Sequence, residues 1–266
     1  MANLTDPARE LSDISIRLSK GSRASGADFL ATEFEVPVWS TEFVKIIACI
    51  LERADLVSET VRSLDMDEDH KHSAMDDING FKSAFVAGSL TAAWNTAGAG
   101  ITMMKDHGRP LQYLSKSVRE KVNYPVLSDD EVGDMIDSID VYLAELAISN
   151  EGPDFVRQAI WDGLQLLLFQ LKHTKWIGAG YTLLAFREIN LVMEAARSQY
   201  GHNSPVDPSR VIDGLAGLLK SFKAKLDTAK GYSDAAEFVW KAYSVGSRVA
   251  TPLLLTGHMP LLPSPF

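Results

Sequence analysis

STEFVKIIACILERADLVSETVRSL, residues 40–64, is the stretch that decides the fold class. Its apolar side chains recur at steps of three and four residues, which places them on one face of a helix, and charged side chains occupy the positions between them. The apolar positions are Phe43, Ile46, Ile47, Ile50, Ala54, Val57, Val61 and Leu64. The sequence therefore predicts one long amphipathic helix that begins near Ser40.

The second half of the chain continues this helical pattern. Residues 128–131, Ser-Asp-Asp-Glu, form a capping box, in which the serine caps a helix and the glutamate three residues later bonds back to it. Residues 155–171 are apolar on nearly every side, which is typical of a helix at the centre of a bundle. Residues 181–200 follow after a turn that contains glycines, so we expect the two segments to pack as a central apolar hairpin.

Strand signals are scarce, because no long alternating run of β-branched residues occurs. We therefore predict an all-α, multi-helix bundle of about eight to ten helices. Residues 38–266 are expected to form a single bundle, with a sub-boundary near residues 122–128 as the alternative. Residues 1–37 are expected to form an N-terminal arm, since residues 21–39 lack helical periodicity. The C-terminus is expected to be an extended Pro-rich tail, because its four prolines prevent a continuous helix.

Composition excludes several classes of protein. The 266 residues include 35 acidic and 26 basic side chains, a formal net charge of −9, which disfavours binding along a nucleic-acid backbone. A hydrophobic content of 46% rules out a disordered chain. A single cysteine rules out a multi-cysteine zinc site. The first residues are polar and lack the layout of a secretory signal, so we expect a cytoplasmic protein.

Residues 65–77 carry the spacing of a calcium-binding loop, with aspartates at alternate positions and another at the twelfth. Histidine stands at the sixth position, where such loops need glycine, so a transition-metal site is a softer alternative. The favoured interpretation is an exposed acidic connector whose aspartates lie at the positive end of the next helix. The candidate ligands of a divalent metal are Asp65, Asp67, Asp69, His70, His72 and Asp76.

Residues 83–104 contain no ionisable side chain and are long enough to span a bilayer as a helix. Small residues at four-residue intervals would let another helix approach closely, within one chain or between two copies. The hydroxyl and amide groups of the segment disfavour a permanent span, so close packing inside a bundle is the simpler interpretation. Membrane insertion after a conformational change is the alternative. The small residues are Gly88, Ala92, Thr96 and Gly100.

Two features suggest a surface for a protein partner. Asp130, Asp134 and Asp137 lie at i, i+4 and i+7 of one helix, and such like charges destabilise the helix unless something compensates them. Compensation is expected from a lysine-bearing helix at residues 220–230, from a basic partner or from a divalent cation; a solvated face is the plainest interpretation. The tail residues Leu261, Leu262 and Phe266 are too apolar for water, so they pack on the bundle or dock into a partner.

No phosphate-binding glycine loop, nucleophile elbow or zinc-protease motif occurs in the sequence. Cys49 lies on the helix from Ser40 and is expected to be buried and inert, and no partner for His107 is evident. We therefore predict a non-enzymatic protein without a cofactor, a regulatory, immunity-type or assembly subunit that binds a protein partner or forms a homo-oligomer. The alternatives are a membrane-active, pore-forming protein that stores residues 83–104 as a helix, and a metal-dependent enzyme or sensor built on residues 65–77.

Overall fold

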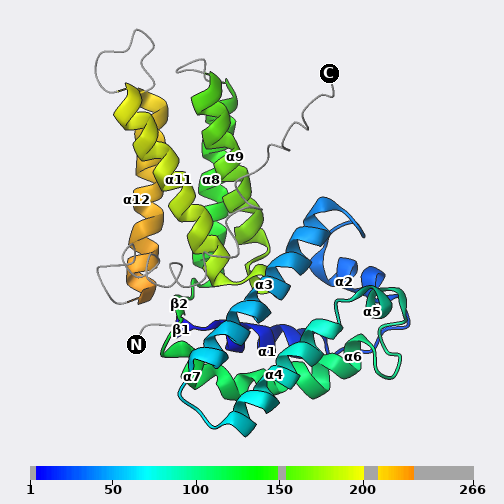
Figure 1. The fold of residues 1–266 in the computed structure, drawn as a ribbon. Coiled ribbons are helices and arrows are strands. Elements are labelled where there is room, and N and C mark those ends of the chain that lie inside the picture. Colours follow the sequence, from blue (N-terminus) through cyan, green and yellow to red (C-terminus); the bar gives the residue numbers. More distant parts are fainter. Residues whose placement is uncertain (1–3, 149–153, 201–208, 231–266) are drawn as a thin grey trace, which may run out of the picture.

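The computed structural model describes residues 4–148, 154–200 and 209–230, and it shows an all-α, multi-helix protein, as predicted (Figure 1). The strands β1 (Leu4–Thr5) and β2 (Tyr124–Pro125) form a short antiparallel pair, in which Leu4 faces Pro125. The tail residues Leu261, Leu262 and Phe266 lie outside the described residues.

An N-terminal unit surrounds the long helix α3 and shares one hydrophobic core (Figure 1). Its elements are α1 (Pro7–Leu18), α2 (Gly26–Phe34), α3 (Thr41–Ser63), α4 (Glu68–Ser83), α5 (Ala87–Thr91), α6 (Gly100–Met103), the π-helical turn η1 (Met104–Gly108), the 3-10 turn η2 (Arg109–Leu114) and α7 (Ser115–Arg119). The helix α3 begins where the sequence predicts it, because the Ser40 side chain accepts a hydrogen bond from the Phe43 amide at 3.2 Å.

A four-helix bundle with its own hydrophobic core stands on the N-terminal unit (Figure 1). Its helices are α8 (Asp129–Ile148), α9 (Asp154–Lys172), α11 (Ala179–Tyr200) and α12 (Ser209–Lys230), with the short helix α10 (Thr174–Ile177) between α9 and α11. The predicted hairpin is formed by α9 and α11, which pack through side chains such as Leu164 and Ile189. The helix α9 is not enclosed on all sides, however, because Phe155 is exposed at its start.

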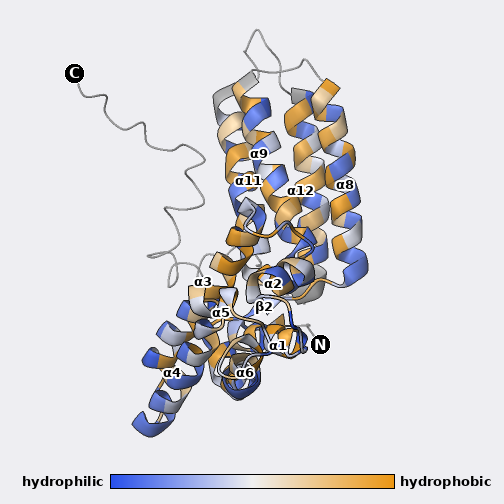
Figure 2. Ribbon diagram, turned by 90° about the vertical axis from the view of Figure 1, so that its right-hand side faces the viewer, coloured by the Kyte–Doolittle hydropathy of each residue, from blue (hydrophilic) through white to orange (hydrophobic). Residues whose placement is uncertain are grey.

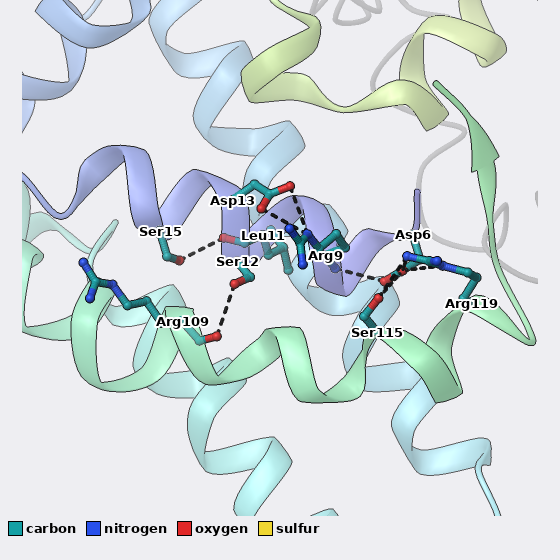
Figure 3. Close-up of polar contacts among 9 residues, drawn as sticks. All are labelled: Asp6, Arg9, Leu11, Ser12, Asp13, Ser15, Arg109, Ser115 and Arg119. Carbon is teal, nitrogen blue, oxygen red and sulfur yellow. Dashed lines mark hydrogen bonds and ion pairs between the residues drawn. The ribbon is translucent and has the colours of Figure 1, made fainter. Parts of the chain in front are cut away.

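The interpretation of residues 1–37 as a loose arm is wrong, because α1 and α2 contribute to the centre of the N-terminal core. Leu11 and Ile14 of α1 are fully buried, and Asp6 caps the helix. Buried serines weaken the apolar pattern by which this helix could be predicted. Ser15 donates a hydrogen bond to the Leu11 carbonyl at 2.8 Å, so a hydroxyl group lies on the buried face of the helix. Figure 3 shows this bond, and with it the bond from Ser12 to the Arg109 carbonyl of the neighbouring segment.

The prediction of one uninterrupted helix over residues 83–104 is also wrong. The chain forms α5 and α6 there, with a turn between them, so Gly88, Ala92, Thr96 and Gly100 do not line one helix face. The cause is Trp94, whose buried indole donates a hydrogen bond to the Leu18 carbonyl at 3.0 Å and ties the turn to the N-terminal unit. Across the described ranges, no helix combines the length and the apolar character that crossing a membrane requires.

Two of these small residues make a matched test of the corrected packing. A methyl group at position 100 would overlap the ring of the fully buried Trp94, whereas a methyl group at position 88 would have nothing within 4 Å. We expect Gly100→Ala to lower the free energy of unfolding by about 1–3 kcal/mol, because overpacking strains a dense core. We expect Gly88→Ala to leave it within about 0.5 kcal/mol. Urea denaturation measures the free energy of unfolding of both variants, and an equal loss in the two would contradict the described packing.

Candidate functional site

The outer face of α8, defined as Asp130, Asp134, Asp137, Val141 and Ile148, is the strongest candidate for a functional surface. All five residues are exposed, and Val141 and Ile148 keep 61% and 83% of their surface in contact with solvent. Steps of three, four and seven residues bring them to one side of the helix. The face is therefore acidic over its first half and apolar over its second.

The opposite side of α8 explains why this face points outward. Met135, Ile139, Leu143 and Leu146 are buried in the bundle core. The capping box sets the start of the helix: the Ser128 hydroxyl accepts a hydrogen bond from the Glu131 amide at 3.2 Å, and the Glu131 carboxylate accepts one from the Ser128 amide at 2.7 Å. Figure 2 shows the resulting mixture of polar and apolar residues along each bundle helix.

One of the three aspartates is compensated within the chain. The Lys225 ammonium of α12 lies 2.7 Å from the Asp134 carboxylate, which confirms the expected contribution of the lysine-bearing helix. Within residues 4–148, 154–200 and 209–230, neither Asp130 nor Asp137 has an ion-pair partner. No cation of the described residues thus neutralises these two carboxylates, and exposed apolar side chains lie on the same helix face.

Residues 65–77 do not form the calcium-binding loop that was the alternative to an acidic connector. The helix α4 begins inside it at Glu68, and Asp67 caps this helix by accepting a hydrogen bond from the Asp69 amide at 2.9 Å. The acidic first turn thus lies at the positive end of the helix dipole, which explains the run of aspartates. His72 and Asp76 pair along the helix at 3.5 Å, and both side chains are exposed. The predicted ligands Asp65, Asp67, Asp69, His70, His72 and Asp76 do not converge, and no part of the described chain gathers three His, Cys, Asp or Glu residues that could hold a metal ion.

A buried ion pair between Glu10 of α1 and Arg53 of α3 was not predicted. Their charged atoms lie 3.1 Å apart, and their side chains are only 12% and 4% exposed. Glu10 also accepts a hydrogen bond from the Ala179 amide at 3.0 Å, and Arg53 donates one to the Trp176 carbonyl. Burial raises the pKa of Glu10 above its ordinary value, and the Arg53 guanidinium opposes this effect. The pair therefore fastens the N-terminal unit to the connection between α9 and α11.

His107 has a partner that its position in the sequence did not reveal. Its Nδ1 atom lies 3.2 Å from an Asp77 carboxylate oxygen of α4, and a side chain at Gly80 would overlap its ring. His107 belongs to η1, and π-helical turns are often found at functional positions.

Cys49 is buried as predicted, and burial raises the pKa of its thiol to about 12.

Comparison with known proteins identifies no relative of this chain: no family model matches it, and neither a curated protein nor a solved structure matches it. The arrangement of the described side chains is therefore the basis for a functional assignment.

Proposed function

We propose that this chain acts non-enzymatically, as a regulatory, immunity-type or assembly subunit, by binding another protein through the outer face of α8. The observation that carries the proposal is the alignment of Asp130 and Asp137, which have no ion-pair partner among the described residues, with exposed Val141 and Ile148 on one helix face. Apolar side chains that stay exposed side by side and are bordered by polar residues mark interaction surfaces. The cytoplasmic location stays a prediction.

The chemistry of this face specifies the chemistry of its partner. A segment with lysine or arginine side chains would pair with Asp130 and Asp137. Its apolar side chains about one and three helical turns beyond the contact with Asp137 would cover Val141 and Ile148. An amphipathic helix supplies such an order of side chains, because residues four and seven positions apart share one face. The acidic half would then steer the encounter, and the apolar half would supply most of the affinity.

The test compares two doubly substituted forms of the tagged chain in affinity capture from cells that produce it. Asp137→Lys with Val141→Ser alters the outer face of α8, whereas Glu59→Lys with Val86→Ser makes the same chemical changes at exposed positions elsewhere. We expect the first variant to lose at least about tenfold of the captured partner, since it removes both an attractive charge and an apolar contact. We expect the control variant to capture as much as the unmodified chain.

Equal capture by both variants would contradict the proposal, and so would the absence of any protein that the unmodified chain retains. Light scattering on the purified chain separates the two kinds of partner. A monomer points to a different protein, whereas a dimer that the α8 variant abolishes points to a second copy of the chain.

The two alternative functions lose the structural features on which they were based. Residues 83–104 do not form the helix that a stored membrane segment requires. Residues 65–77 do not form the loop that a calcium site requires, because α4 occupies most of it. Binding of a protein partner is therefore the function that the described side chains support best.

A further inference from the structure

A cavity of about 560 Å³ lies between α1 and the lower ends of α8 and α9, on the opposite side of α8 from the outer face. This volume falls within the range of pockets that hold small molecules. The helix α1 lines it from Arg9 to Arg17, and a helix rises 1.5 Å per residue, so this wall of the cavity is about 12 Å long. Figure 1 shows α1 running beneath the bundle at this junction.

The cavity is basic, although the protein as a whole is acidic. Six basic and three acidic side chains line it: Arg9, Arg17, Arg53, Arg119, Lys172 and Lys175, and Glu10, Asp13 and Asp129. The excess of positive charge contrasts with a formal net charge of −9 for the whole chain. Low-dielectric walls concentrate the field of such a cluster, which favours an anion inside.

Four of the six cations already have acidic partners. Besides the buried Glu10–Arg53 pair, Arg9 lies 3.2 Å from Asp13. Arg119 donates two hydrogen bonds of 3.1 Å to the buried carboxylate of Asp6. Figure 3 shows both of these last two pairs. Lys175 lies 3.5 Å from Glu35, and both side chains are well exposed, so that pair is weak.

Arg17 and Lys172 are the two cations left over. Both are exposed, and neither has an ion-pair partner within the described parts of the chain. Arg17 and Lys175 also line a second cavity of about 350 Å³, which Trp176 closes. The indole nitrogen of Trp176 is buried without a hydrogen-bond partner in the described residues. A buried N–H group of this kind calls for an acceptor. Arg17 and Lys175 thus line both cavities, Lys172 lines the first, and the Trp176 indole lines the second.

Apolar side chains line the cavity near the start of α1, beside the charged Arg9, Arg119 and Asp129. They are Leu4 of β1, Leu127 after β2, and Val132 and Ile136 of α8. Leu127, Val132 and Ile136 are only partly buried by the protein itself. Apolar surface that remains open at the bottom of a cavity is stabilised when an apolar group covers it.

We propose that this cavity, called here the junction cavity, binds an amphipathic anion. A carboxylate or phosphate group lies between Arg17, Lys172 and Lys175, and an apolar chain runs along α1 towards Val132 and Ile136. The head group accepts charge-assisted hydrogen bonds, which are about twice as strong as neutral ones. This activity is separate from the proposed use of the outer face of α8, and each stands without the other.

The test uses four probes on the full purified chain, below their micelle-forming concentrations: decyl phosphate, decanoate, decanol and inorganic phosphate. Isothermal titration calorimetry is expected to show saturable one-to-one binding of decyl phosphate, of decanoate or of both. The stronger of the two identifies the head group. Decanol and inorganic phosphate, which each lack half of the ligand, are expected to bind at least about tenfold more weakly.

A matched pair of variants locates the site. Arg17→Gln with Lys172→Gln removes the two lining cations that have no ion-pair partner among the described residues, and we expect it to weaken binding of the amphipathic anion by at least about tenfold. Arg62→Gln with Lys116→Gln makes the same change at exposed positions outside both cavities, and we expect it to have no effect. All four residues are exposed, so both variants are expected to keep the helical circular-dichroism spectrum of the unmodified chain.

Three results would overturn the proposal. The first is no saturable binding of either amphipathic anion to the unmodified chain. The second is equal binding of decanol, which would mean that the basic end contributes nothing. The third is an equal loss of affinity for the amphipathic anion in both double variants, which would mean that the anion responds to the net charge of the protein and not to the junction cavity.

Discussion

Replacing Arg53 by methionine is expected to lower the free energy of unfolding by about 3–5 kcal/mol, because it leaves the Glu10 carboxylate buried without its cation. The Trp176 carbonyl also loses the hydrogen bond that Arg53 donates. These contacts join α1 and α3 to the connection between α9 and α11, so the loss is expected to affect both units. Urea denaturation at neutral pH measures it.

The loss is expected to depend on pH in a definite direction. Burial holds the pKa of Glu10 above its ordinary value, and without Arg53 this pKa rises further. A carboxyl group whose pKa is raised by folding contributes its full stability below the pKa of the unfolded chain and loses it as the pH rises through the folded pKa. The difference between Arg53→Met and the unmodified chain is therefore expected to be larger at about pH 8 than at about pH 4.

Two further variants make this prediction specific. Adding Glu10→Gln to Arg53→Met removes the unpaired charge while keeping an acceptor for the Ala179 amide, so a large part of the lost stability is expected to return. Arg9→Met removes one partner of an exposed pair, Arg9–Asp13, and is expected to change the stability by about 1 kcal/mol or less. A loss from Arg53→Met no larger than that from Arg9→Met would show that the buried pair does not stabilise the fold.

Trp94→Ala is expected to lower the free energy of unfolding by about 3–5 kcal/mol, the range for truncating a buried aromatic side chain. Trp94 is fully buried, stacks on Phe29 with 5.0 Å between ring centroids, and bonds to the Leu18 carbonyl. Residues 83–104 form a turn between α5 and α6 and not one long helix, and the Trp94 side chain anchors this turn. Thermal and urea unfolding both report the loss.

Trp39 provides the matched control, because its side chain is 57% exposed and packs only at the edge of Phe43. Trp39→Ala is expected to change the stability by about 1 kcal/mol or less. If the two tryptophan variants were equally stable, Trp94 would not anchor the segment as described.

Local signals in the sequence were sufficient for much of the fold. The α3 stripe, its Ser40 cap and the capping box before α8 depend on residues within one or two turns of each other, and all three are present. Of the candidate surface, the acidic half was predicted from spacing alone. Its apolar half was not, because Val141 and Ile148 look like core residues until the bundle assigns them to the outside.

Non-local contacts explain the rest. The Leu18–Trp94 bond joins residues 76 positions apart and holds the turn in which Gly98 has a positive φ of 76°. The Glu10–Arg53 bond spans 43 positions. The residues next to each partner in the sequence therefore do not indicate that its charge is buried. The junction cavity draws on β1, α1, α8 and α9 at once. Sites assembled from distant segments in this way leave no local pattern to detect.

Site-specific photo-crosslinking tests the proposed function most directly. A benzoylphenylalanine residue at position 141 samples the outer face of α8 inside living cells, and the same residue at position 59 samples the exposed side of α3. We predict a protein adduct at position 141, with the crosslinked segment of the partner carrying basic residues within two helical turns, and no such adduct at position 59. An adduct at neither position, or the same adducts at both, would contradict the role of α8 in binding a partner.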